Sequence, residues 1–161
     1  MAVRRSIDPI ARFLQEHDAT LMQLSALNRA TRTLADQGYS DDAMGRVRTA
    51  VQFLAEEVGD HNTREEEALF PVLERYVEGP THVMREEHKE LKRELRKLQT
   101  AARAVRSSRV STTTLRTLRS RAQTVIQRFV NHIHKENHIL FPLVQKFLTR
   151  DALREIARRM V

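Results

Sequence analysis

Apolar residues recur every three or four positions through most of the chain, which is the spacing of one face of an α-helix. Turn and capping residues interrupt this pattern at a few places, such as Asp8-Pro9, Gly38 and Gly79-Pro80. The pattern predicts four long helices, over about 8–37, 41–78, 81–106 and 111–148. A short basic helix is expected to follow over 151–160.

Two prolines, Pro71 and Pro142, lie late in the second and fourth predicted helices, and we expect each to bend or interrupt its helix. The connections are short, so consecutive helices should run antiparallel. The sequence therefore predicts an all-α fold, an up-down-up-down four-helix bundle with a short C-terminal helix. We expect one domain over 1–161, with the bundle core at about 8–148.

The amino-acid composition excludes several kinds of cofactor site and binding partner. The chain has no cysteine, which excludes disulfides, thiolate metal sites and a resident iron–sulfur cluster. The net charge is +7, but the basic residues are spread through the helices and there is no Trp, so we do not expect nucleic-acid binding. No apolar run is long enough to span a membrane, and no hydrophobic segment follows Arg4 and Arg5. We expect a cytoplasmic protein.

The most informative feature is an internal repeat with an offset of 71 residues. The segment from His61 to Pro71 reads HNTREEEALFP, and the segment from His132 to Pro142 reads HIHKENHILFP. The same offset relates Glu16-His17 to Glu87-His88. The chain thus consists of two similar helical hairpins, each with one His on its first helix and a His-x-x-x-Glu on its second.

Six polar residues of this repeat fall on the apolar faces of the predicted helices: His17, His61, Glu65, His88, His132 and Glu136. A His and a Glu four residues apart lie on one helix face about 6 Å apart along its axis, so both can face one core cavity. Two buried carboxylates beside four imidazoles are costly unless something binds them. Metal ions would satisfy all six.

The simpler alternative is that the histidines are ordinary core residues and the glutamates pair with Arg or Lys. The repetition of the whole pattern favours metal binding. The remaining histidines, His82, His134 and His138, are expected at the surface, as are Glu66, Glu67 and Glu86. Glu16 and Glu87 adjoin predicted ligands and could orient them, but exposure is the simpler expectation.

These motifs resemble the hemerythrin-like HHE cation-binding family, which has His on helix 1, His-x-x-x-Glu before Leu-Phe-Pro on helix 2, and the same again on helices 3 and 4. The resemblance implies that His17 and His61 hold one iron, that His88 and His132 hold the other, and that Glu65 and Glu136 bridge them. It also implies an oxo or hydroxo bridge between the ions. Imidazole and carboxylate ligands alone would suit Zn or Mn as well, so the resemblance is what favours iron.

The sequence departs from the oxygen-carrying hemerythrins at two places. Met84 stands where they have a second His on helix 3, and Glu136 follows His132 after three residues where they have an Asp after four. We therefore do not expect reversible oxygen transport.

We expect a non-haem di-iron protein that binds, senses or detoxifies O₂, peroxide or NO. A di-iron enzyme with peroxidase-like, catalase-like or iron–sulfur repair activity is an alternative. A zinc-binding bundle or a purely structural bundle also remains open, and the sequence names no protein partner.

Overall fold

The computed structural model describes residues 8–161, and nearly all of them are helical. The N-terminal segment with Arg4 and Arg5, where we expect no signal sequence, lies outside the described residues. The helices are α1 (Pro9–Gln37), α2 (Asp41–Arg64), α3 (Phe70–Leu73), α4 (Pro80–Ala104), α5 (Thr112–Lys135), α6 (Phe141–Phe147) and α7 (Arg150–Arg159). π-helical turns at Glu65–Leu69 and Glu136–Leu140 join α2 to α3 and α5 to α6.

The helices begin where the capping residues predict. The Asp8 side chain accepts a hydrogen bond from the backbone N–H of Ile10, with Pro9 in the first turn of α1. Ser40 caps α2 in the same way, and Ser111 and Thr114 form a reciprocal capping box at the start of α5. These caps fix where three of the four long helices begin.

Two glycines make the sharp connections. Gly38 ends α1 with φ of 89°, and Gly79 precedes α4 with φ of 108°, a region that L side chains rarely adopt. The second and third predicted helices are shorter than expected. The helical conformation before Gly79 ends with α3 at Leu73, and α4 ends at Ala104 because Val105 is extended and Arg106 to Arg109 form a tight turn.

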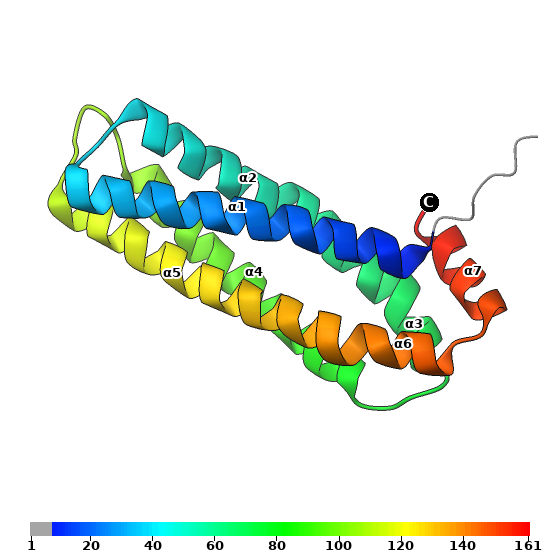
Figure 1. The fold of residues 1–161 in the computed structure, drawn as a ribbon. Helices are drawn as coiled ribbons and strands as arrows, with labels where there is room; N and C mark the ends of the chain where they lie inside the picture. The colour runs from blue at the N-terminus through cyan, green and yellow to red at the C-terminus, as the bar shows by residue number, and fades with distance from the viewer. Residues whose placement is uncertain (1–7) are drawn as a thin grey trace, which may run out of the picture.

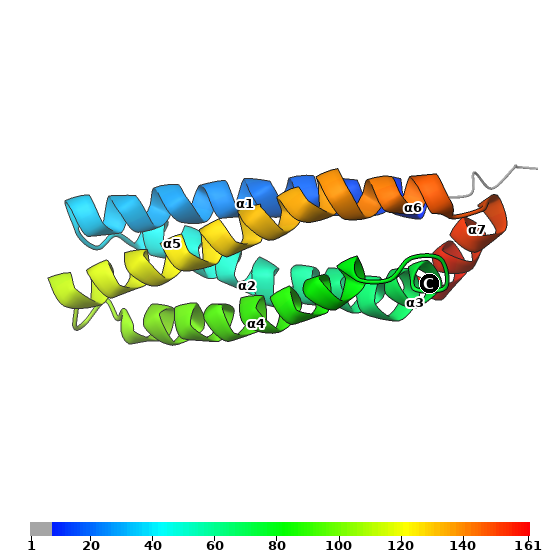
Figure 2. The same cartoon turned by 90° about the horizontal axis from the view of Figure 1, so that it is seen from below.

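The four long helical arms run alternately up and down, as Figures 1 and 2 show. α1 packs against α2 and α5, and α4 packs against the same two helices. The predicted up-down-up-down bundle is therefore confirmed. α7 turns back across one end of the bundle, beside α3 and the beginning of α1 (Figure 1). No helix within residues 8–161 is long and apolar enough to cross a membrane.

The two predicted proline interruptions are π-helical turns. In each turn the backbone N–H of the Phe before the proline donates to a carbonyl five residues back, from Phe70 to Glu65 and from Phe141 to Glu136. Proline lacks an N–H, and its ring would clash with the carbonyl four residues back in a regular helix. One wider turn relieves that clash, and the helix continues. Glu65 and Glu136 are the first residues of these two turns.

The core consists of two apolar clusters. One fills the end of the bundle at which the α1–α2 and α4–α5 connections lie (Figure 1), and it includes Leu27, Leu54, Leu98 and Leu118. The other lies at the end covered by α7 and is built from α1, α4, both Leu-Phe-Pro segments and α7, including Ile156. Along every long arm, the predicted metal ligands lie between residues of the first cluster and residues of the second. A polar layer thus divides the core.

Candidate metal centre

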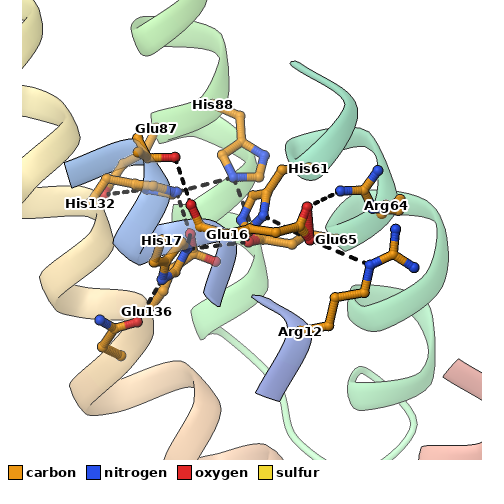
Figure 3. Close-up of polar contacts among 12 residues, drawn as sticks. Arg12, Glu16, His17, His61, Arg64, Glu65, Glu87, His88, His132 and Glu136 are labelled. Carbon is orange, nitrogen blue, oxygen red and sulfur yellow. Dashed lines mark hydrogen bonds and ion pairs between the residues drawn. The ribbon is translucent and has the colours of Figure 1, made fainter. Parts of the chain in front are cut away.

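All six predicted ligands meet in this polar layer (Figure 3). The four histidines come from the four long helices, and the two glutamates come from the π-helical turns. Their ligand atoms form two groups, each with all its atoms within 4.8 Å of one another. One group is His17, His61, Glu65 and Glu136, and the other is Glu65, His88, His132 and Glu136. The two glutamates belong to both groups, so the arrangement suits two ions side by side.

The Nε2 atoms of the four imidazoles face the two carboxylates. His132 Nε2 is 2.6 Å from a Glu136 oxygen, and His61 Nε2 contacts Glu65 in the same way. His88 Nε2 is 3.4 Å from Glu65. His17 Nε2 contacts both carboxylates, at 3.5 Å from Glu136 and 3.8 Å from Glu65. Six donor side chains therefore converge on one small volume.

Both carboxylates are fully buried, and neither is satisfied by hydrogen bonds. Glu65 and Glu136 have 0% of their surface exposed, and none of their four oxygens has a hydrogen-bond partner among residues 8–161. The Nε2 atoms of His17 and His61 are likewise buried without one. Buried polar atoms are almost always hydrogen-bonded, so this concentration needs an explanation. A buried layer of nitrogen and oxygen donors without hydrogen-bond partners fits bound cations.

The pKa values of two histidines in the centre also show that its surroundings favour positive charge. Burial alone would lower the pKa of His61, but the Glu65 and Glu16 carboxylates outweigh it and raise that pKa to about 10. Burial likewise acts to lower the pKa of His132, and Glu136 and Glu87 raise it to about 10. The His61 charge keeps the pKa of Glu65 well below its usual value although burial opposes this. Without metal, protons on the His61 and His132 imidazoles would offset buried negative charge in the centre.

Each of the four histidines is also contacted from behind, at Nδ1. His88 Nδ1 is 2.9 Å from Glu66, and His132 Nδ1 is 3.2 Å from Glu87. His17 Nδ1 is 2.6 Å from the Asn137 side-chain oxygen, and His61 Nδ1 is 3.6 Å from Glu16. The contacts of His17, His88 and His132 are hydrogen bonds, whereas His61 Nδ1 has no hydrogen-bond partner within residues 8–161. An Nδ1–H that donates to such a partner leaves the Nε2 lone pair free for a metal, and this pairing is typical of histidine ligands.

The simpler expectation, that Glu16, Glu66 and Glu87 are exposed, is therefore wrong, and the contacts of Glu16 and Glu87 agree with the alternative that they orient neighbouring histidines. All three are partly buried and contact the predicted ligands, because neighbouring helices bring their histidines within reach. Asn137 was not predicted at all. The available signal was the internal repeat, since Asn137 is 71 residues after Glu66. Glu67, Glu86, His82, His134 and His138 are exposed, as expected.

Aromatic rings from the repeat form part of the wall. Phe141 stacks on His17 with centroids 5.4 Å apart, and Phe70 stacks on His88 at 5.8 Å. Phe13 meets His61 edge to face at 5.1 Å. These three phenylalanines are among the most deeply buried side chains. The Leu-Phe-Pro segment of each repeat thus contributes a ring that keeps water from one side of the centre.

One cavity reaches the centre from the surface. Its volume is about 390 Å³, it lies between α2 and α4, and its lining includes Gly59, Asn62, Glu66, His88 and Lys92. A void of about 10 Å³ lies inside the centre, among His17, His61, His132 and Glu136. A larger cavity, about 590 Å³, is near the α4–α5 connection, and its lining includes none of the six predicted ligands.

The comparisons agree with this geometry. The family model for the hemerythrin HHE cation-binding domain matches residues 8–144. The chain is also similar to a probable iron-sulfur cluster repair protein of Haemophilus influenzae (strain ATCC 51907 / DSM 11121 / KW20 / Rd), with 27% identity over 139 residues. That match covers 84% of this chain and 61% of the relative, so the chain spans about three fifths of the relative's length. The family match and the buried His and Glu cluster together indicate a metal-binding helical bundle.

Proposed function

The chain belongs to the hemerythrin HHE cation-binding domain family, and on that premise we propose that it is a non-haem di-iron protein that reacts with O₂, peroxide or NO. His17 and His61 would hold one iron, His88 and His132 the other, and Glu65 and Glu136 would contact both. The observation that carries this proposal is that two four-residue donor groups share the same two buried carboxylates. The donor set alone also suits Zn or Mn, so the choice of iron rests on the family.

A pair of iron ions supplies one- and two-electron chemistry toward O₂, peroxide and NO when bound. Two imidazoles and two shared carboxylates per ion leave room for a small exogenous ligand. The buried phenylalanines restrict water at the centre, and the cavity beside His88 offers a route for a small molecule. Restricted access favours diatomic ligands and peroxide over larger organic substrates.

The metal content of the purified protein tests the first half of the proposal. We expect nearly two irons per chain by elemental analysis of protein purified without added metal. The ultraviolet–visible spectrum should show charge-transfer bands in air that change on reduction. His61→Ala combined with His132→Ala removes one donor from each group and should abolish most of the iron.

The matched control is His134→Ala with His138→Ala. These two exposed histidines have the same spacing along the chain as a ligand pair, on the arm that carries His132, and they should not affect iron content. Absence of metal in repeated preparations, with no uptake of added Fe(II) or Zn(II), would overturn the proposal.

Reaction with small ligands tests the second half. We expect the reduced iron-loaded protein to change its spectrum on addition of O₂, peroxide or NO, and the His61/His132 double variant not to respond. A reversible change with stoichiometric ligand would indicate binding or sensing. Consumption of many equivalents would indicate a detoxifying enzyme. A spectrum that no ligand alters would contradict both possibilities.

Iron–sulfur cluster repair is a second candidate, and the similarity to the probable iron-sulfur cluster repair protein supports it. The substrate would be a damaged cluster on another protein. The test is whether the iron-loaded chain, with a thiol reductant, restores activity to a peroxide-damaged [4Fe–4S] enzyme. The same amount of free iron and the His61/His132 double variant are the controls. Equal recovery with free iron alone would refute repair by this chain.

A further inference from the structure

The internal repeat relates the surroundings of one predicted metal position to those of the other. Glu16 contacts His61 Nδ1 and pairs with Arg64, and 71 residues later Glu87 contacts His132 Nδ1 and pairs with Lys135. Phe70 and Phe141, which stack on His88 and His17, are related in the same way. If this correspondence held everywhere, the two positions would be chemically equivalent.

The repeat does not hold for the residues that contact the Nδ1 atoms of His88 and His17. His88 Nδ1 faces the Glu66 carboxylate at 2.9 Å, whereas His17 Nδ1 faces the Asn137 amide oxygen at 2.6 Å. Glu66 and Asn137 occupy the same place in the two repeats. The two contacts have similar geometry, but only the contact at His88 brings a negative charge.

A second difference acts in the same direction. Arg12 lies 3.9 Å from Glu16, on the same side of it as Arg64 in Figure 3. The residue related to Arg12 by the repeat is Val83, which is uncharged and exposed. Among the ion pairs within residues 8–161, Glu16, the carboxylate behind His61, pairs with two guanidinium groups. Of the two carboxylates behind His88 and His132, only Glu87 pairs with a side-chain cation outside the centre, the Lys135 ammonium.

We propose that the His88–His132 position binds a divalent cation more tightly than the His17–His61 position, and that Glu66 and Asn137 are the positioning residues that set this order. A carboxylate on Nδ1–H makes the imidazole a stronger donor, and removal of such a partner typically lowers metal affinity about 10- to 100-fold. Nearby negative charge further favours a divalent cation. This inference rests on the two-metal centre of the proposed function.

Zinc titration with histidine-resolved detection tests the order of occupancy. Zn(II) is redox-inert and diamagnetic, so the ring nitrogens of ¹⁵N-histidine-labelled metal-free protein can be followed by long-range ¹H–¹⁵N correlation spectra. At half an equivalent of Zn(II), we expect His88 and His132 to show zinc-ligated Nε2 signals about tenfold more populated than those of His17 and His61. Exchanging the two positioning residues, Glu66→Asn with Asn137→Glu, should shift that preference toward His17 and His61 without changing the number of carboxylates.

Variants with a single substitution test the same inference even if the double exchange variant does not fold. Glu66→Gln keeps the side-chain size and should reduce the preference, because both histidines would then face an amide. Glu67→Gln is the matched control, since Glu67 is the exposed neighbour of Glu66, and it should leave the order unchanged. Equal filling of both positions in the wild type, or a preference that Glu66→Gln does not alter, would overturn this inference while leaving the two-metal proposal intact. Failure to bind any zinc would instead overturn the two-metal proposal itself.

Discussion

The imidazoles of the centre are oriented by side chains that lie outside the predicted ligand set. Glu87 shows this most clearly, because its carboxylate contacts His132 Nδ1 at 3.2 Å and the Lys135 ammonium at 2.8 Å. The hydrogen bond from His132 is the main cause that lowers the pKa of Glu87 to about 2, against a smaller opposing effect of burial. Glu87 is therefore ionised at neutral pH and can fix the His132 ring with Nε2 toward the centre.

Glu87→Gln should weaken metal binding without preventing folding. The amide keeps the size of the side chain but removes the charge that supports the His132 Nδ1–H. We expect the affinity for Zn(II), measured by calorimetric titration of the metal-free protein, to fall about 10- to 100-fold. Glu86→Gln is the control, because Glu86 is exposed and pairs with Lys89 instead. Equal affinities in the two variants would show that Glu87 does not support the ligand.

The sequence predicted which six residues come together in the core and offered Glu16 and Glu87 as candidates to orient them, but it did not single out Glu66 or Asn137, and the reason is physical. His61 and Glu65 fall on an apolar stripe of their own helix, so periodicity places them inside the bundle. Glu66 contacts His88 on a different helix, and the distance between two packed helices cannot be inferred from the pattern of either one. The proline positions predicted interruptions, but the form of the interruption, a π-helical turn, depends on backbone geometry that composition does not encode.

At the scale of elements, α7 packs against one end of the bundle and completes an apolar cluster there. The short basic segment predicts this helix, and α7 contributes Ala152 and Ile156 to the apolar cluster at its end of the bundle, where the adjoining Met160 also packs. Its Glu155 makes two 2.9 Å hydrogen bonds with Arg75, in the turn after α3. α7 therefore covers the end of the cluster that contains the two Leu-Phe-Pro segments.

Ile156→Ala should destabilise the protein markedly. Ile156 is fully buried, and truncation of such a residue typically costs about 2–5 kcal/mol, since it leaves a cavity as well as less buried apolar surface. Urea denaturation followed by circular dichroism would measure the change in the free energy of unfolding. Ile139→Ala makes the same truncation at a side chain that is 56% exposed, and it should cost less than about 0.5 kcal/mol. A similar small effect in both variants would mean that α7 does not pack as described.

The Arg75–Glu155 pair should make the docking of α7 sensitive to acid. The hydrogen bond from Arg75 is the main cause that lowers the pKa of Glu155 below its usual 4.5. A carboxyl group with a depressed pKa in the folded state stabilises that state above its unfolded-state pKa, and this stabilisation is lost as the pH falls through the folded-state value. We therefore expect Glu155→Gln to be less stable than the wild type at pH 7, and the difference to disappear as the pH falls well below 4.5. A difference that persists at low pH would exclude this explanation.

At the scale of the whole molecule, the polar layer of the six predicted ligands separates two apolar clusters. All four long arms contribute a histidine to that layer, so cations bound there would connect every arm at mid-bundle. A ligand that binds only the folded state adds stability in proportion to the logarithm of its concentration over its dissociation constant. The folding stability of the bundle should therefore depend on metal supply.

Metal removal should accordingly lower the melting temperature of the whole bundle. With free metal at about 100 times the dissociation constant, each bound ion adds about 2.7 kcal/mol, which corresponds to about 5–10 °C per ion for a domain of this size. We expect that difference between the metal-loaded and chelator-treated wild type in thermal denaturation followed by circular dichroism. The His61→Ala/His132→Ala variant should show no such difference, and the His134→Ala/His138→Ala variant should keep it in full. A shift retained when His61 and His132 are replaced would mean that the stabilising ion binds elsewhere, because those two imidazoles belong to the two separate donor groups of the centre.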